Sequence, residues 1–171
     1  METKKTILIA DTSEEFRTVL AEAIQAEEGL EVVGQTGDGQ EAIQLVQDRD
    51  PDVLVMDLVL ERMDGFDVLK VMRCYSWLDE IPVIMISSED TVDAVRRAFD
   101  LGASDYISRP FDAKVVYQRI INTIQLYAKQ RRLSAMVADQ VSQKEKRSQM
   151  MIGILSRVVE RRNGESRTHV Q

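Results

Sequence analysis

The chain has 171 residues, of which 44% are hydrophobic and 30% are charged, with a formal net charge of −7. The length fits one domain plus an extension, and the negative charge argues against nonspecific nucleic-acid binding by the whole chain. The single cysteine, Cys74, excludes an internal disulfide and a cysteine-rich metal site. Because no segment resembles a signal peptide or reaches transmembrane length, we expect a cytoplasmic protein.

Charge is divided unevenly along the chain. Residues 1–127 carry a formal charge of −13, and residues 128–171 carry +6. The simpler interpretation of the basic segment is a solvated helix face. The alternative is a segment that contacts an acidic partner or the acidic part of its own chain.

Three short apolar runs rich in valine and isoleucine predict strands that are buried on both faces, as in a parallel sheet. These runs are residues 6–10, 53–56 and 83–86. Weaker runs at residues 31–34 and 105–108 suit the edges of such a sheet.

Apolar residues with helical spacing predict a helix after each strand. The predicted helices are residues 16–24, 37–47, 66–72 and 92–99, and a fifth that begins after Asp112 as its N-cap. The stretch "TSEE" (12–15) is typical of a capping box before the first helix. The apolar positions of the fourth helix are Val92, Val95, Ala98 and Phe99.

Five strand–helix repeats predict an α/β fold, a doubly wound parallel sheet in three layers. The reactive crevice of such a sheet lies at the carboxyl ends of its strands. The polar residues at those ends are Asp11, Asp57, Ser87 and Arg109. Asp57 directly follows a buried run, where an uncompensated charge is costly, so it is a helix cap, a metal ligand or a nucleophile.

Five motifs in fixed order carry a family resemblance. They are "LIAD" (8–11), "GQEAI" (39–43), "PDVLVMDLVLERMDGFDVL" (51–69), "IPVIMISS" (81–88) and "AFDLGASDYISRPF" (98–111). Residues 4–127, which contain them, resemble the receiver domain of bacterial two-component response regulators. The resemblance implies the strand order 2-1-3-4-5 and a non-enzymatic switch that accepts a phosphoryl group from a sensor histidine kinase.

The resemblance also implies roles for individual residues. Asp57 aligns with the phosphoacceptor of the family. Asp11, Asp57 and the backbone carbonyl of Val59 align with the ligands of a Mg²⁺ ion. Ser87, Tyr106 and Arg109 align with the residues that respond to the phosphoryl group.

Three positions depart from the family pattern. Thr12 replaces the second acid of the metal site, and a hydroxyl is a poorer Mg²⁺ ligand than a carboxylate. Arg109 replaces a lysine, and Glu61 replaces a proline and brings a further carboxylate close to the site. We therefore expect weak Mg²⁺ binding and impaired phosphorylation. The alternative is a pseudo-receiver that mediates protein contacts without phosphate chemistry.

Two further residues have structural interpretations. Cys74 lies on a predicted helix, where we expect it to pack rather than to react. Trp77 precedes the fourth strand, and we expect it to anchor that loop.

The segment after Pro110 contains no proline, and its first glycine is Gly153. This pattern predicts one very long helix, or two in line, from Asp112 to about Arg162. A heptad seam runs along it, with apolar ends and a polar middle. The seam consists of Leu126, Leu133, Val137, Met151, Ile154 and Val158, with Gln130, Gln140, Lys144 and Arg147 between them. We expect residues 128–162 to form a coiled coil that holds a homodimer. The alternative is a solvated linker helix.

Residues 154–171 resemble the opening of HD-type metal phosphohydrolase domains, the HD-GYP group included. Glu165 and His169 match a spacing that contributes metal ligands in that family. We expect residues 163–171 to be the incomplete start of such an output domain, unable to hydrolyse a phosphodiester. No helix-turn-helix is evident in residues 128–171, so we expect no direct contact with nucleic acid.

Overall fold

The computed structural model describes residues 3–168 and the side chains of residues 3–164. The chain divides into two compact units, Met1–Tyr127 and Ala128–Gln171, and each is described by itself.

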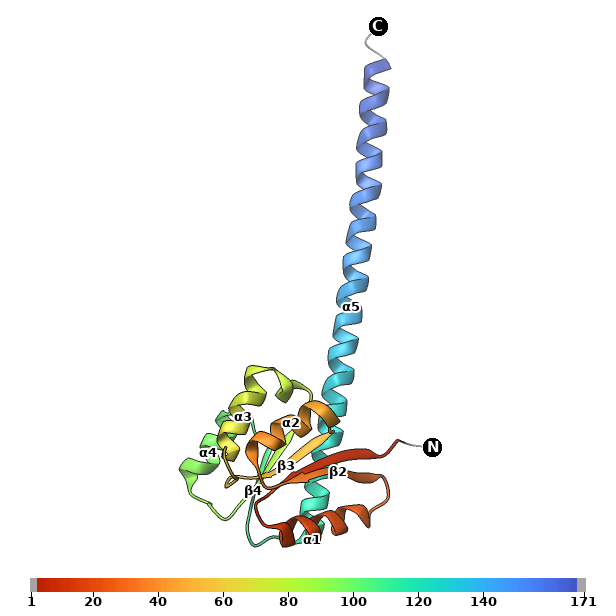
Figure 1. The fold of residues 1–171 in the computed structure, drawn as a ribbon. Coiled ribbons are helices and arrows are strands. Elements are labelled where there is room, and N and C mark those ends of the chain that lie inside the picture. Colours follow the sequence, from red (N-terminus) through yellow and green to blue (C-terminus); the bar gives the residue numbers. More distant parts are fainter. Residues whose placement is uncertain (1–2, 169–171) are drawn as a thin grey trace. The chain divides into compact units, whose positions relative to one another are not determined.

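The first unit is built on a five-stranded parallel sheet with the order β2-β1-β3-β4-β5 (Figure 1). Its strands are β1 (Lys5–Ala10), β2 (Leu30–Thr36), β3 (Val53–Asp57), β4 (Val83–Ser87) and β5 (Asp105–Ser108). The predicted order, the parallel pairing and the edge positions of β2 and β5 are confirmed. All residues of β3 and β4 are buried, as their continuous apolar runs predict.

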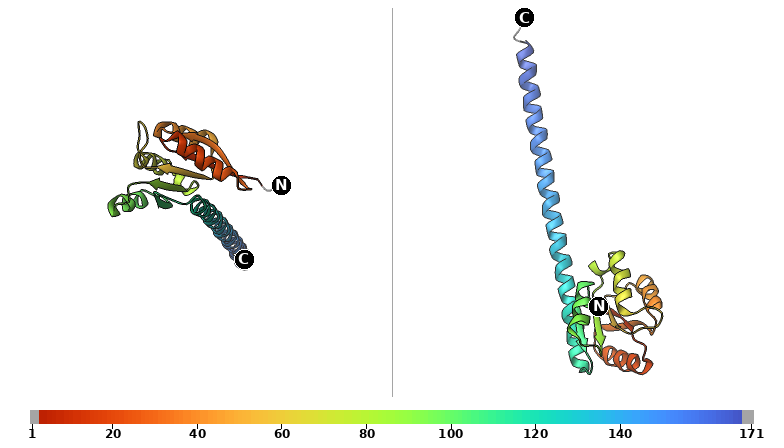
Figure 2. Two further views of the ribbon diagram at one scale, coloured as in Figure 1. Left: turned by 90° about the horizontal axis from the view of Figure 1, so that it is seen from below. Right: turned by 90° about the vertical axis from the view of Figure 1, so that its left-hand side faces the viewer.

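Helices cover both faces of the sheet, which makes three layers (Figures 1 and 2). They are α1 (Glu14–Gln25), α2 (Gly39–Arg49), α3 (Gly65–Cys74), α4 (Val92–Asp100) and the start of α5 (Ala113–Thr168), and a short 3₁₀ helix, η1 (Trp77–Asp79), precedes β4. One core cluster joins the sheet to α1 and the first turns of α5. The other joins it to α2, α3 and α4.

Short polar side chains cap the helices of this unit. The carboxylates of Asp38, Asp64 and Asp112 accept hydrogen bonds from backbone N–H groups in the first turns of α2, α3 and α5. The prediction for α1 is wrong by one residue. The N-cap is Ser13, whose hydroxyl accepts a hydrogen bond from the N–H of Phe16, and Thr12 is exposed.

The predicted apolar face of α4 is wrong in part. Val92 and Phe99 are 70% and 46% exposed, whereas the small residues Ala94 and Ala98 are buried. These two alanines lie four residues apart and hence on one side of the helix, so α4 meets the core through its smallest side chains. Apolar spacing alone did not distinguish the two sides.

Two expectations for the α3–β4 connection have different outcomes. Cys74 is exposed at the end of α3, because the buried positions of this helix stop at Met72. The packing role expected for the cysteine is therefore wrong. Trp77 lies in η1, is half-buried and packs against the core cluster.

α5 is a single helix of 56 residues that runs through Gly153 and beyond the predicted end at Arg162. Its first turns bury Val116, Ile120 and Ile124 in the first unit. In the second unit no side chain in residues 128–164 is buried. None of the helices within the described residues is both long enough and apolar enough to cross a bilayer.

Candidate functional site: an acid pair bridged by an arginine

Four neighbouring strands deliver polar side chains to one edge of the sheet. Asp57 and Ser87 are the last residues of β3 and β4, and Asp11 and Arg109 directly follow β1 and β5. Because the strands are parallel and adjacent, their carboxyl ends lie at the same edge. The structure therefore brings together the four residues that the strand ends predicted.

Asp57 is a buried carboxylate, with 9% of the residue exposed. Its Oδ1 atom accepts a hydrogen bond from the backbone N–H of Val59 at 3.3 Å. Burial raises the pKa of Asp57 above its ordinary value of 3.8, Arg109 opposes this rise, and the nearby charge of Asp11 adds to it. Burial thus outweighs the opposing charge of Arg109, and the net pKa of Asp57 is raised.

The guanidinium of Arg109 is the cation beside Asp57. Its Nη2 atom forms an ion pair with Oδ2 of Asp11 and lies 3.4 Å from Oδ2 of Asp57. One nitrogen therefore bridges the two carboxylates, and their mutual repulsion is offset within the chain. Nε of Arg109 is buried and has no hydrogen-bond partner among the described residues.

Aromatic side chains hold Arg109 from the other side. Its guanidinium carbon lies 4.1 Å from the ring centroid of Phe16 on α1, a cation–π contact. Phe16 in turn meets Phe111 edge to face, with ring centroids 5.3 Å apart. Sequence reasoning placed Phe16 on the apolar face of α1 but missed this contact, because no local pattern links residues so far apart in the chain.

Asp11 is the most enclosed acid of the site, with 2% exposed. Its Oδ1 atom accepts a hydrogen bond from the N–H of Ser13 at 2.8 Å, and its carbonyl accepts one from Arg17. Asp11 therefore accepts a hydrogen bond from a loop amide and also pairs with Arg109. The exposed side chain of Thr12 makes no hydrogen bond with the described residues.

The loop after β3 is tied to the start of α2. The N–H of Glu61 donates to the carbonyl of Gly37, and the carbonyl of Glu61 accepts from the N–H of Gly39. Gly39 is required here, since a Cβ at this position would lie 2.2 Å from the carbonyl oxygen of Met63. The side chain of Glu61 is exposed, so its part in the loop comes from its backbone.

Arg62 and Asp38 close the same loop with an ion pair that the sequence did not predict. Burial alone would raise the pKa of Asp38. The hydrogen bonds from Arg62 and from the N–H groups of Glu41 and Gln40 together lower it by more, so the net pKa is below the ordinary value. This carboxylate thus belongs to the loop and helix cap rather than to the acid pair.

Ser87 and Tyr106 contact the loop after β4. The hydroxyl of Ser87, a buried residue, accepts a hydrogen bond from the N–H of Glu89 at 3.1 Å. The half-buried Tyr106 donates its hydroxyl proton to the carbonyl of the same Glu89. Both residues are therefore coupled to one short loop beside the acid pair.

The second predicted group of ligands lies at the end of the chain. Glu165 is in the described part of α5, but its side chain is not among those described, and His169 lies outside the described residues. Within the part of the chain that the structure describes, no group of three or more histidine, cysteine, aspartate or glutamate side chains is arranged to hold a metal ion. A metal at the acid pair would need a backbone carbonyl and water as further ligands.

Comparison with known proteins agrees with this fold. The family model of the response regulator receiver domain matches residues 7–121 of this chain. A protein-glutamate methylesterase/protein-glutamine glutaminase from Pyrococcus horikoshii is 41% identical over 107 residues, which are 61% of this chain and 28% of that protein. The chain therefore spans little more than a quarter of this relative.

Solved structures show the same likeness. The response regulator domain of Thermotoga maritima CheB is 27% identical, with a TM-score of 0.62, and the match covers 72% of this chain and 96% of that one. The signal receiver domain of a putative response regulator NarL from Mycobacterium tuberculosis has a TM-score of 0.69 at 24% identity, with 72% and 98% covered. The latter likeness bears on the fold alone.

Proposed function

The chain belongs to the response regulator receiver domain family, and we propose that Asp57 is its phosphoacceptor. The observation that carries the proposal is the convergence of Asp11, Asp57, Ser87 and Arg109 at one edge of the sheet. A carboxylate oxygen of Asp57 attacks phosphorus and forms an acyl phosphate. The bond from phosphorus to the donor breaks, and its electron pair leaves with the histidine of a sensor kinase or with a small acid.

Mg²⁺ is the ion that this chemistry requires in the family, and the donor set fits it. Asp11, Asp57 and the carbonyl of Val59 would hold it, because Mg²⁺ binds through one or two carboxylates and keeps several waters. When bound, the ion would offset negative charge on the phosphoryl oxygens. Thr12 offers a hydroxyl in place of a second acid, so we propose that the ion binds weakly.

Arg109 gives this receiver its particular character. The guanidinium already pairs with Asp11 and Asp57, which supports the proposal that it occupies the place where a phosphoryl group or a metal has to enter. We propose that Arg109 must release Asp57 before modification and then pairs with the phosphoryl oxygens, which a guanidinium binds well. Ser87 and Tyr106 respond through the loop that both contact. Phosphorylation is therefore slowed rather than lost.

Treatment with acetyl phosphate and Mg²⁺, followed by intact mass, tests this proposal. We expect slow, partial addition of one phosphoryl group at Asp57, faster addition in Thr12→Asp, and none in Asp57→Asn. The matched control is Ser134→Asp, which adds the same charge at an exposed position of α5 in the second unit. Rapid complete modification of the wild type at millimolar Mg²⁺ would contradict the claim that Thr12 weakens the metal site.

A second function, that of a pseudo-receiver, is favoured by one observation. The acid pair is satisfied by Arg109 without any ion or phosphoryl group. If the double variant Thr12→Asp, Arg109→Lys also takes up no phosphoryl group and no beryllofluoride, the chain serves protein contacts without phosphate chemistry.

The proposal extends to the long helix. We propose that residues 128–162 pair with a second copy of the chain as a coiled coil, and that the state of the receiver reaches a C-terminal output domain through this pair. The support is the heptad seam, whose apolar members are exposed along α5. The chain would then be a cytoplasmic part of a phosphorelay and would not itself contact nucleic acid.

The nature of the output domain rests on sequence alone. Glu165 and His169 support an HD-type phosphohydrolase that would begin at about residue 163. The test is metal analysis of this chain, in which we expect no tight binding of iron, manganese or zinc, because two ligands from one helix leave most of the coordination sphere to water. Stoichiometric binding that His169→Ala abolishes would contradict this expectation.

A further inference from the structure

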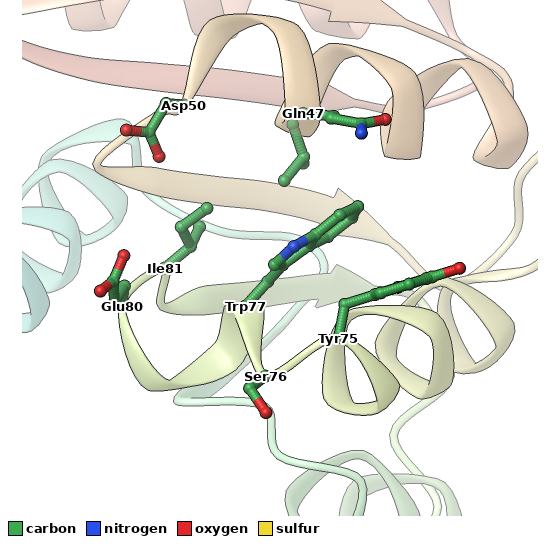
Figure 3. Close-up of a pocket in the computed structure, with 8 residues that line it drawn as sticks. Gln47, Asp50, Tyr75, Ser76, Trp77, Glu80 and Ile81 are labelled. Atoms are coloured by element: carbon green, nitrogen blue, oxygen red, sulfur yellow. The ribbon is translucent and has the colours of Figure 1, made fainter.

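A hollow lies at the opposite edge of the sheet from Asp57. It is lined by the end of α2 and by Asp50, Tyr75, Ser76, Trp77, Glu80 and Ile81, and its volume is about 470 Å³ (Figure 3). Asp50 precedes β3 and Ile81 precedes β4, so this hollow, the Trp77 pocket, lies at the amino ends of strands whose carboxyl ends carry the acid pair.

One wall of the Trp77 pocket is a stacked aromatic pair. The rings of Tyr75 and Trp77 have centroids 5.2 Å apart and planes inclined by 22°. The indole N–H of Trp77 has no hydrogen-bond partner among the described residues. A flat aromatic surface of this kind attracts a planar cation that can stack on it.

Two carboxylates lie at the other end of the pocket. Figure 3 shows Asp50 and Glu80 flanking Ile81, with Trp77 beyond it. Neither side chain forms an ion pair or a hydrogen bond with a described residue, and no lysine or arginine lines the pocket. The pocket thus combines an aromatic wall with two uncompensated negative charges.

The backbone around the pocket is held in unusual conformations. Asp50 (φ 45°) and Ser76 (φ 60°) are two of the three described non-glycine residues with a left-handed backbone, and both line this pocket. Asp50 is the C-cap of α2 and Ser76 is the N-cap of η1. These two caps therefore fix where the two helices end and begin beside the pocket.

We infer that the Trp77 pocket binds the guanidinium group of an arginine side chain from a partner polypeptide. The guanidinium would stack on the aromatic wall and donate to the carboxylates of Asp50 and Glu80, since its planar fork of N–H donors suits both contacts. Tyr75 is 65% exposed. In a polypeptide, the residues on either side of the arginine would cover the tyrosine ring, whereas a guanidinium group alone is too small to do so. The inference does not depend on phosphorylation of Asp57.

Fluorescence of the full chain tests the inference directly, because Trp77 is the only tryptophan in the sequence. The probes are an arginine peptide with blocked ends, Ac-Gly-Arg-Gly-amide, and the same peptide with neutral citrulline in place of arginine. We expect a saturable change in emission with the arginine peptide and none with the citrulline peptide. An equal response to both, or a response that does not saturate, would overturn the inference.

Variants identify the groups that bind. Glu80→Gln and Asp50→Asn should each weaken binding about tenfold, the loss of one charge-assisted contact. Asn tolerates the left-handed backbone, so the Asp50 variant keeps the pocket wall. Asp48→Asn is the control, since Asp48 is an exposed acid in the last turn of α2, two residues before Asp50, and does not line the pocket. Unchanged affinity in both pocket variants would exclude the carboxylates as ligands.

Free arginine distinguishes the source of the guanidinium. We expect it to bind at least about tenfold more weakly than the blocked peptide, because it leaves Tyr75 uncovered. Equal or tighter binding of free arginine would contradict a polypeptide partner.

Discussion

The two units of the chain treat their apolar residues in opposite ways. In the receiver unit, the apolar residues of the central strands β1, β3 and β4 are almost completely buried. In residues 133–159, the large apolar side chains of α5 are 49% to 66% exposed. The first unit therefore completes a core by itself, whereas the second offers an apolar seam that only another surface can cover.

The two units also differ in charge, with −13 on residues 1–127 and +6 on residues 128–171. The acidic receiver unit derives its stability from burial within one chain, and the basic helix should derive its stability from association. Each of the following experiments acts on one unit and should leave the other unchanged.

Removal of the second unit should have the largest effect. We expect the full chain to sediment as a dimer and a chain ending at Tyr127 to be a monomer at high micromolar concentration, because the seam is lost. The shortened chain should still unfold cooperatively, since Val116, Ile120 and Ile124 remain in its core. If the full chain and the shortened chain are both monomers, the seam does not hold chains together.

Gly39→Ala should be the most damaging single change in the receiver unit. Its Cβ would lie 2.2 Å from the carbonyl oxygen of Met63, which belongs to the loop tied to α2. We expect urea unfolding to give a loss of roughly 2–4 kcal/mol, with dimerisation unchanged. Gly153→Ala is the matched control. Nothing lies within 4 Å of its Cβ, so it should instead stabilise the helix, by roughly 0.5–1 kcal/mol.

A charge in the seam should weaken association without affecting the receiver. Leu133→Lys places an ammonium group at a position that is apolar and 61% exposed in the single chain. We expect the dissociation constant of the dimer to rise by roughly 10- to 100-fold, as measured by analytical ultracentrifugation. Ser134→Lys adds the same charge one residue away, off the seam, and equal effects of the two changes would show that the seam position is irrelevant.

Asp57→Asn should have the smallest effect, and one that depends on pH. Because the pKa of Asp57 is raised in the folded state, folding takes up a proton between pH 3.8 and that raised value. The free energy of unfolding therefore falls as pH rises through this window. At pH values above the window, the folded state carries the full cost of burying the charge. We expect the variant to melt a few degrees higher than the wild type at pH 7 and at the same temperature below pH 3.8. A higher melting temperature at both pH values would point to a cause other than ionisation.

The sequence predicted the central strands and their convergence on one edge because both follow from local patterns, whereas the strand order was implied by the family resemblance. Continuous apolar runs locate β3 and β4, and Asp57 is simply the residue at which one run ends. The N-cap of α1 was misplaced because Thr12 and Ser13 are both suitable caps, and only the loop geometry set by Asp11 selects between them.

Other features depend on tertiary contacts that no local pattern contains. The burial of Ala98 and the exposure of Phe99 depend on how closely α4 approaches the sheet. The exposure of Cys74 depends on where α3 leaves the core. The pairing of Arg109 with Asp11 and Asp57 and its support by Phe16 join residues that are far apart in the chain.

The contact between Arg109 and Phe16 has a consequence for how this family varies among organisms. A phenyl ring supports a guanidinium through stacking, and it supports the compact ammonium of lysine less well. A lineage that exchanges Arg109 for lysine thereby relaxes the selection on Phe16. We expect an aromatic residue at position 16 and an arginine at position 109 to be gained and lost together across homologous sequences.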